Sequence, residues 1–447
     1  MNPNPQHPMT MRRTFWTVVI TLAVSSFMAR AAAAEVPAAG QVAPYAIKST
    51  YATAETCDYK SQGVFIVWWD KKFDYATQAA ATIKTLAAVR DECLGTYQMS
   101  DPPNPLAGFY YNVYLHNGSD LFKPQGWAMG QGTDENRYPF LTIPIGYATT
   151  GNSGLQHEGF HIFQYKANSP GFVYRGDSQW FIEATANWYA VTKHPQSNEG
   201  YITASAVTAN PQVTLWYTFE NREPGDKNNW QRCNHLYGMH TFMNYLTDVR
   251  KVPQALMVEG FFAKTSQLPQ EYLSRKLGAA EFAGLYADFA AHNVSGFPEF
   301  PAGTEARAAE ELKNYGDAQD VHPLVQTYAN EGTGGNWVRP PKDFVTRGWA
   351  YNVYKINNSA AATYTFQIKG DAKGSDGAAA AFQGRVVVRT GATARQYPLT
   401  MADATSGQQM VEVAATDADV YLIVAATPDC FRGNQTYSYE VKIDRKL

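Results

Sequence analysis

A change of pattern near Gly348 divides this chain of 447 residues. Upstream, apolar patterns of helical length recur, first at 75–97 and then, with interruptions, from about 154 to 291. Downstream, only short apolar and β-branched runs occur, separated by turn residues, as at 364–368 and 420–424. Short strands without intervening helices are typical of a β-sandwich. The sequence therefore predicts an α+β region followed by a C-terminal all-β sandwich.

Strand and helix patterns alternate at the start of the α+β region. Runs at 64–69 and 109–115 indicate buried strands, with the helical pattern of 75–97 between them and one or two further strands within 126–145. This order predicts a mixed sheet followed by helices. We expect the domain limits to be 35–300 for the α+β domain (sheet part about 48–150, helical part about 151–300), 301–345 for a breaker-rich connector and 346–447 for the sandwich.

The first 34 residues have the three parts of a secretory signal. Arg12 and Arg13 precede an apolar stretch at 15–28, and four alanines at 31–34 offer a small-residue cleavage site. That stretch is shorter than the roughly 20 residues that a membrane helix needs. We therefore expect a signal peptide at 1–34 and a protein that is secreted, extracellular or periplasmic, without membrane insertion.

The net charge and the number of cysteines indicate which kinds of partner the protein can bind and in which compartment it is found. With 37 Lys and Arg against 40 Asp and Glu, the net charge is −3, which argues against nucleic-acid binding. Four cysteines fit an oxidising compartment and allow three disulfide pairings. We favour Cys57 with Cys93, which bracket one strand and one helix, and then Cys233 with Cys430.

A metal-binding motif opens the first helical pattern after the sheet. The segment from His157 to His161 has the form H-E-x-x-H, which puts both histidines on one face of a helix with Glu158 beside them. Catalytic zinc takes three protein ligands and keeps a fourth position open. Glu183, 22 residues after His161 on a second helical pattern, is the candidate third ligand. The alternative is a helix whose histidines hydrogen-bond into a core or face solvent.

Together these residues resemble the gluzincin metallopeptidases, in which an H-E-x-x-H helix is followed by a second helix with a glutamate ligand. The segment Trp180-Phe181-Ile182-Glu183-Ala184 is similar to the W-L-N-E-G-F segment of the aminopeptidase-N-like branch. The resemblance implies a zincin-like fold, bound Zn²⁺, His157, His161 and Glu183 as its ligands, and Glu158 as general base. Asn187 resembles the position that orients a histidine ligand.

The resemblance also implies a mechanism of amide hydrolysis. Zinc makes hydroxide available at neutral pH, and Glu158 accepts the proton and passes it to the leaving amine. Tyr237, 54 residues after Glu183, is the first candidate for stabilising the oxyanion. Tyr174, His235 and His240 are the alternatives, and each of these candidates can instead have only a packing role.

One departure from the aminopeptidase branch bears on specificity. The segment at 126–130 has no glutamate where that branch keeps a G-x-M-E-N strand, so the sequence favours an endopeptidase acting on protein or peptide substrates. The strand at 137–145 is expected to be the edge along which an extended peptide pairs. The overall layout also resembles the exported Svx/AvrXca-type virulence-associated proteins of plant-pathogenic bacteria.

Two other functional classes stay open from the sequence. A glycan-binding or glycan-cleaving protein would use exposed aromatic side chains, with Glu158 and Glu183 as a carboxylate pair and the sandwich as a cell-wall or glycan contact. An inactive zincin would act as an adhesin or effector. Zinc content separates the first class from the metallopeptidase hypothesis, and the variant Glu158→Gln separates the second.

Overall fold

The structure of the protein is a computed structural model that describes residues 45–49, 51–118, 130–134, 137–149, 152–193, 203–204, 206–208, 210–221, 234–294, 326–328, 335–391, 393–417 and 419–446. The predicted signal peptide at 1–34, the segment 126–129, most of the predicted connector and Cys233 lie outside these residues. The secretion and domain-limit hypotheses therefore stay predictions.

The first sheet is mixed, as the strand patterns predict. Its order is β1-β2-β3-β5-β4, in which β2, β3 and β5 run parallel and the two outer pairs are antiparallel. The central strands β2 and β3 are buried along their whole length, as apolar parallel strands usually are. The strands are β1 (Cys57–Gln62), β2 (Phe65–Asp70), β3 (Tyr111–His116), β4 (Gly130–Thr133) and β5 (Pro139–Pro144).

The prediction that 137–145 forms the edge strand is wrong. These residues form β5, which lies between β3 and β4, and the edge is β4. The reason is that β4 precedes β5 in the chain and folds back against its outer side as an antiparallel partner. Order along the sequence therefore does not give order across the sheet.

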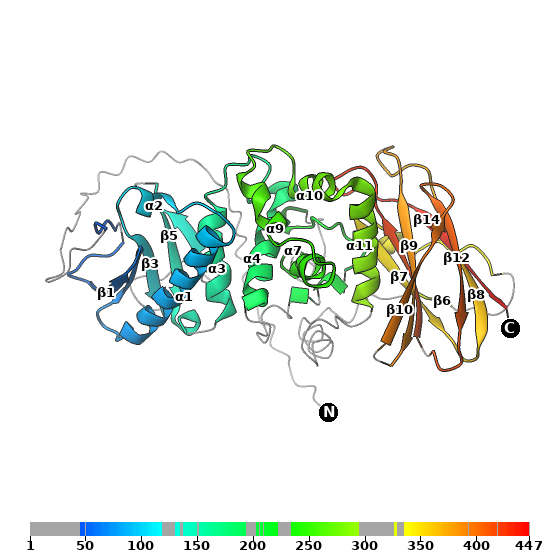
Figure 1. Cartoon of the computed structure of the whole chain (residues 1–447), viewed down its shortest axis with the longest axis horizontal. Helices are drawn as coiled ribbons and strands as arrows, with labels where there is room; N and C mark the ends of the chain where they lie inside the picture. The colour runs from blue at the N-terminus through cyan, green and yellow to red at the C-terminus, as the bar shows by residue number, and fades with distance from the viewer. Residues whose placement is uncertain are drawn as a thin grey trace, which may run out of the picture. The chain divides into compact units, whose positions relative to one another are not determined.

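Two helices cover one face of this sheet (Figure 1). They are α1 (Ala76–Gly95) and α3 (Ser153–Gln164), which contact each other along their length. Their approach is close at Gly159, where an added Cβ would lie 2.9 Å from Cδ2 of Leu86. The N-terminus of α3 is capped by Asn152, whose Oδ1 accepts a hydrogen bond from the backbone N–H of Leu155 at 3.2 Å.

Further helices follow α3 and continue to 293, as the helical pattern predicts. The longest are α4 (Gln179–Lys193) and α11 (Ala279–Asn293), and α4 packs against α3, α7 and α8. The shorter helices are α2 (Pro103–Leu106), α7 (His235–Gly238), α8 (His240–Asn244), α9 (Leu256–Glu259) and α10 (Pro269–Leu277), with single helical turns at Ile145–Tyr147, Gly176–Ser178, Phe219–Asn221, Tyr245–Val249, Gly260–Phe262 and Lys342–Phe344.

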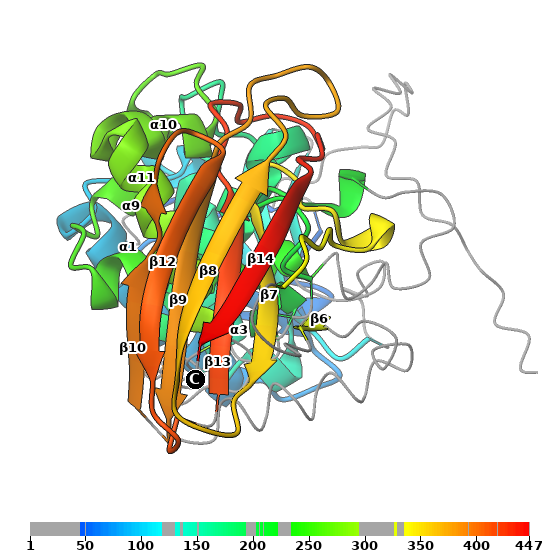
Figure 2. The same ribbon diagram turned by 90° about the vertical axis from the view of Figure 1, so that its right-hand side faces the viewer.

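The predicted strand-rich C-terminal region is confirmed, and its strands form two sheets (Figure 2). Their orders are β10-β9-β13-β7-β6 and β11-β12-β8-β14, and one core cluster draws buried residues from both. The strands are β6 (Gln326–Tyr328), β7 (Ala350–Asn357), β8 (Ala362–Gly370), β9 (Phe382–Thr390), β10 (Thr393–Pro398), β11 (Thr400–Met401), β12 (Ser406–Val413), β13 (Asp419–Ala426) and β14 (Tyr439–Lys446).

The outer face of the larger sheet packs against α11. The largest core cluster runs from the first sheet through the helices to Trp349 at the start of β7. Two buried hydrogen bonds join the two regions: Tyr286 donates to the backbone oxygen of Trp349 at 2.7 Å, and Asn293 donates to the hydroxyl of Tyr351 at 2.9 Å. The helical region and the strands thus share one hydrophobic core.

The favoured pairing of Cys57 with Cys93 is wrong, because both thiols are free and buried. Side chains alternate between the two faces of a strand. Cys57 packs with Trp68 on one face of the sheet, whereas Cys93 belongs to α1 and packs with the cluster of Val67 on the other. The sheet therefore separates them. Cys430 is also a free thiol.

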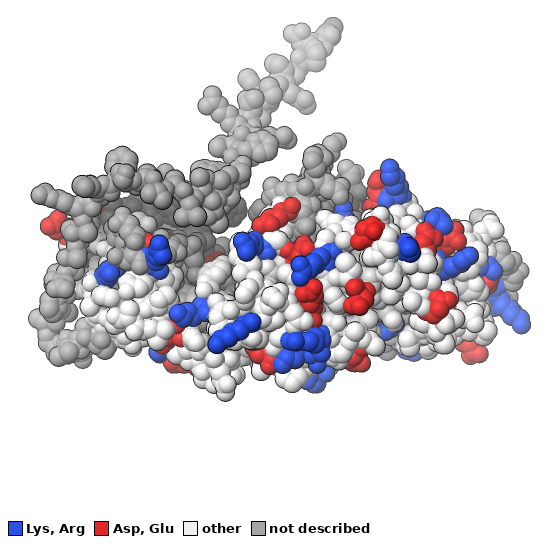
Figure 3. Space-filling view, turned by 90° about the horizontal axis from the view of Figure 1, so that it is seen from above, with Lys and Arg blue, Asp and Glu red and all other residues white. Residues whose placement is uncertain are grey.

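The described surface carries mixed charge. On the face drawn in Figure 3, acidic and basic side chains are interspersed, in line with the net charge of −3. Within the described ranges, no helix has the length and apolar character that crossing a membrane requires.

The shared core gives a stability prediction. Replacing Trp349 with alanine removes ring contacts with Phe282 and Phe431 and leaves a cavity, so we expect Trp349→Ala to lower the free energy of unfolding by about 3–5 kcal/mol. The matched control is Trp337→Ala, since the Trp337 side chain is 41% exposed. Urea unfolding followed by circular dichroism measures both; equal effects of the two substitutions would contradict the role of Trp349.

Candidate metal centre

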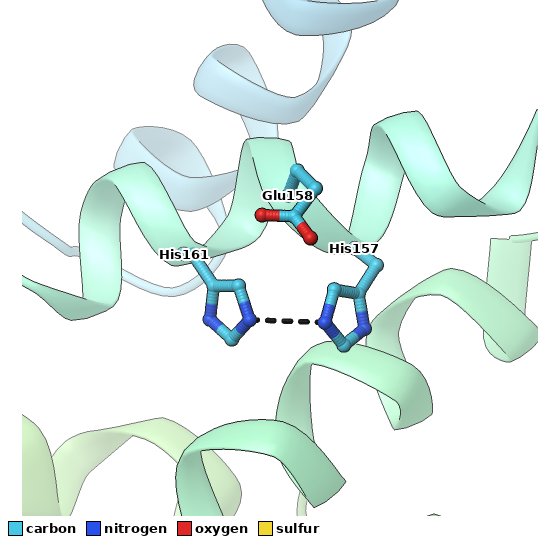
Figure 4. Close-up of side chains that lie close together, drawn as sticks. All are labelled: His157, Glu158 and His161. Carbon is cyan, nitrogen blue, oxygen red and sulfur yellow. Dashed lines mark hydrogen bonds between the residues drawn. The ribbon is translucent and has the colours of Figure 1, made fainter. Parts of the chain in front are cut away.

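The two histidines of the H-E-x-x-H motif lie on one face of α3 and meet through their Nε2 atoms. The His157 and His161 rings are nearly perpendicular, at 88°, and the two Nε2 atoms are 2.9 Å apart (Figure 4). Four residues are about one helical turn, which brings the imidazoles to the same position along the helix axis. Both rings are buried, His157 8% and His161 3% exposed.

Helix α4 brings the carboxylate of Glu183 to the same point. Its Oε2 lies 3.1 Å from Nε2 of His157 and 3.3 Å from Nε2 of His161. The side chain is buried, because α4 packs directly on α3. The predicted third ligand thus meets the two histidines, although it is distant from them in the sequence.

Two amide side chains fix the orientation of the imidazoles. Oδ1 of Asn187 lies 2.7 Å from Nδ1 of His157, and Oε1 of Gln164 lies 2.6 Å from Nδ1 of His161. The amide orientations follow from their other bonds: Asn187 Nδ2 donates to the Tyr237 backbone oxygen, and Gln164 Nε2 donates to Thr185 Oγ1. Oxygens only accept, so each Nδ1 carries the proton and donates.

Lone pairs therefore converge at the centre of this group. A neutral imidazole that is protonated at Nδ1 presents a lone pair at Nε2. The Nε2 atoms of His157 and His161 then face each other and a carboxylate oxygen of Glu183 at 2.9–3.3 Å, with no proton to share between them. A tetrahedral ion with bonds of about 2.0–2.1 Å holds its ligand atoms about 3.3–3.4 Å apart. The three atoms fit the donor set of a divalent cation.

Glu158 lies beside the same centre. The candidate ligand atoms of His157, Glu158 and His161 are all within 4.8 Å of one another, so this His-Glu-His cluster could hold a metal ion. Two carboxylates, those of Glu158 and Glu183, are thus near the imidazoles. Glu183 contacts both Nε2 atoms at 3.1–3.3 Å, and the Glu158 carboxylate lies beside the two imidazoles (Figure 4).

Their surroundings move the pKa values of the two carboxyl groups in opposite directions. Burial raises the pKa of Glu158 to about 7, assisted by the nearby Glu183 and opposed by His157. Burial would also raise the pKa of Glu183, but its contacts with His161 and His157 outweigh burial and lower that pKa below its usual range. Divergent pKa values of neighbouring carboxyl groups are typical of sites where one group binds and the other transfers protons.

Two of the predicted oxyanion candidates lie at this centre. The Tyr174 hydroxyl donates to Oε1 of Glu183 at 2.6 Å, and the Tyr237 ring lies 6.2 Å from the His157 ring. Burial raises the pKa of the Tyr237 hydroxyl well above its usual value, so it stays protonated as a donor. His235 is buried on α7, which lowers the pKa of its imidazole to about 3, and His240 pairs with Asn244 inside α8.

Sequence reasoning missed Gln164. Its position three residues after His161 on α3 is the available signal, because residues three apart share a helix face. A glutamine has no special place in the H-E-x-x-H pattern, and its role depends on α4, which supplies the Ile182 oxygen and the Thr185 hydroxyl that orient the amide.

Comparison with known proteins gives a family. The model of a family of unknown function, DUF6055, matches residues 35–445. The chain belongs to this family. No curated protein matches the chain. The match covers the α+β region and the strand-rich region together, so both are parts of this family's architecture.

Solved structures show weak similarity. The pre-peptidase C-terminal domain of a collagenase from Bacillus anthracis is 12% identical, with 27% of this chain and 97% of that chain covered and a TM-score of 0.19. The periplasmic inhibitor of g-type lysozyme, PliG, from Aeromonas hydrophila is 18% identical, with 28% and 98% covered and a TM-score of 0.19. A 4-O-methyl-alpha-glucuronidase of family GH115 is 8% identical, with 78% and 54% covered and a TM-score of 0.14.

The two amides give a prediction about metal affinity. Removing the acceptor behind either histidine frees its ring to rotate, so we expect Gln164→Ala and Asn187→Ala each to weaken metal binding by about 10- to 100-fold. Gln164→Glu keeps an acceptor and should retain most of the affinity. Competition between the protein and a chelating dye for zinc or cobalt measures the change.

The control for these variants is Gln156→Ala, which removes an amide from the same helix without taking an acceptor from either Nδ1 atom. Unchanged affinity in both Gln164→Ala and Asn187→Ala would show that the amides do not orient the ligands.

Proposed function

We propose that this chain is a secreted zinc metallopeptidase of the gluzincin type that cleaves peptide bonds as an endopeptidase. The observation that carries this proposal is the convergence of two imidazole lone pairs and a carboxylate oxygen at 2.9–3.3 Å, with a second carboxylate beside them. Structural packing alone does not account for three electron-rich atoms meeting in a buried place.

His157, His161 and Glu183 would hold the zinc ion. Two nitrogens and one carboxylate oxygen form a three-ligand set that leaves one position open, as in catalytic zinc sites. Zinc bound there would lower the pKa of a bound water to about 7 and would polarise a substrate carbonyl. Asn187 and Gln164 hold the two rings in the tautomer that ligation requires.

Glu158 moves the proton. Its carboxylate accepts a proton from the attacking water and hands it to the leaving amine, for which a pKa near neutrality is suited. The Tyr237 hydroxyl, protonated through its raised pKa, is the donor to the oxyanion that develops on the substrate carbonyl. Tyr174 has a different role, because its hydroxyl is committed to Glu183 and fixes that carboxylate.

A zincin-like arrangement supports a peptide substrate. The mixed sheet has an edge strand, β4, which pairs antiparallel with β5 and contacts α3. An extended peptide can add to the edge strand of a sheet through main-chain hydrogen bonds. The predicted signal peptide supports action outside the cytoplasm, and contact of the strand-rich region with cell wall or glycan stays a prediction.

The glycan-cleaving alternative is less well supported. A glycosidase needs both carboxyl groups free to flank a sugar. Here the Glu183 carboxylate is occupied by His157, His161 and Tyr174. An inactive zincin would keep the same ligands, so zinc content and activity have to be measured separately.

The first test separates metal binding from proton transfer. We expect His157→Ala to lose zinc, measured by elemental analysis of the purified chain, because one of three ligands is gone. Glu158→Gln should keep about one zinc per chain and lose about 10²- to 10⁴-fold in kcat/KM on internally quenched peptides. The matched control is Glu412→Gln, an exposed glutamate on β12. Full activity in Glu158→Gln would contradict the proposal.

The second test separates the two tyrosines. Tyr237→Phe should lower kcat by about 10²- to 10³-fold without changing zinc affinity, because it removes an oxyanion donor. Tyr174→Phe should weaken zinc binding, since Glu183 loses its hydrogen bond. Tyr272→Phe, which loses a hydroxyl bonded to Glu259 instead, is the control. The opposite pattern in the first two variants would reverse their roles.

A further inference from the structure

A cavity of about 610 Å³ opens beside the metal centre. Its apolar wall includes Pro139, Ile162 and Phe262, and its charged lining residues are Arg137 and Lys166. Acidic side chains are not among its described lining residues. The cavity therefore combines an apolar wall with positive charge.

The two cations lack partners in the described part of the chain. Neither Arg137 nor Lys166 has an ion pair or a side-chain hydrogen bond with another described residue. Two described acids of this region are engaged elsewhere: Asp101, next to the lining residue Ser100, forms a bidentate pair with Arg90 at 2.7–2.8 Å, and Asp134 accepts a hydrogen bond from the backbone N–H of Tyr138. The positive charge at the cavity is thus available to a ligand.

The cavity is linked to the metal centre through Tyr165. This residue lines the cavity, and its ring stacks on the His161 ring with centroids 5.5 Å apart and an angle of 22°. Tyr165 follows His161 by one helical turn, a rise of about 6 Å along α3. An extended peptide covers that distance in about two residues.

The cavity also lies at one end of the edge strand. Thr133, the last residue of β4, pairs with Pro139, which lines the cavity, and Arg137 belongs to the turn between β4 and β5. A peptide that extends β4 and passes the metal centre would therefore reach the cavity near the end of the strand.

We propose that this cavity is a substrate subsite that binds a carboxylate of the peptide, one or two residues from the cleaved bond, through Arg137 and Lys166. The proposal rests on the proposed function. Arginine forms bidentate hydrogen bonds with carboxylates, and lysine adds a second positive charge beside it. The carboxylate has two possible sources, an Asp or Glu side chain within the peptide and the peptide's own C-terminus.

The kinetic test compares, for the wild type and for each variant, the cleavage of a charged peptide with that of its neutral analogue. On the zinc-loaded protein, internally quenched peptides carry Glu or Gln at successive positions, and the ratio of their kcat/KM values is measured. We expect the ratio to favour Glu at one position and to fall about 3- to 10-fold in Arg137→Ala and in Lys166→Ala. Charge reversal in Arg137→Glu should take the ratio below one.

The matched control is Lys84→Ala, an exposed lysine on α1 away from the cavity. It should leave the Glu-to-Gln ratio as in the wild type. Cleavage with no preference for Glu at any position, or a preference that Arg137→Ala and Lys166→Ala leave intact, would overturn the subsite and leave the proposed function standing.

The source of the carboxylate and the proposed function are tested separately. Peptides with a free or an amidated C-terminus distinguish a terminal carboxylate from a side chain, by a loss of kcat/KM on amidation. Binding of a fluorescent Glu peptide and its Gln analogue to Glu158→Gln, measured by anisotropy, needs no cleavage. Charge-selective binding that Arg137→Ala abolishes supports the subsite even where the wild type cleaves nothing, whereas equal binding of both peptides overturns it.

Discussion

The candidate metal centre depends on two neutral amides. Asn187 and Gln164 each offer an oxygen to a histidine Nδ1, and their own N–H groups are held by Tyr237 and by α4. Because those oxygens can only accept, both imidazoles direct lone pairs at Glu183. The packing of α4 on α3 and α7 is what keeps all of these groups in register. The packing of these helices therefore determines how the candidate ligands and the two amides lie relative to one another.

Much of this centre was accessible from the sequence. The spacing of His157 and His161 fixes a common helix face, and Glu183 lies on a second apolar helix that has to pack on the first. Its meeting with both Nε2 atoms follows from that packing. Gln164 was not accessible, since nothing in a single sequence tells which polar residue near a histidine will turn toward its Nδ1 atom.

The sequence was sufficient to predict which secondary-structure elements each region of the fold contains. Runs of buried β-branched residues and helical periodicities identified the mixed sheet, the helices and the strand-rich region. Arrangements that depend on spatial order were not predictable: β4 folds outside β5, and Cys57 and Cys93 lie on opposite faces of the sheet. The position of a strand within a sheet and the face to which a side chain points depend on contacts between segments, which the sequence of either segment alone does not contain.

The shared core around Trp349 and Tyr286 holds the helical region and the strand-rich region together by non-covalent contacts, in addition to the chain that connects them. A single backbone break between Val294 and Trp349 would cut the chain but none of the contacts of α11 with β9 and β13. Removing the residues after the break would instead expose the apolar face of α11 that packs against β9 and β13. A nicked molecule can therefore stay assembled, whereas a truncated one loses part of its interior.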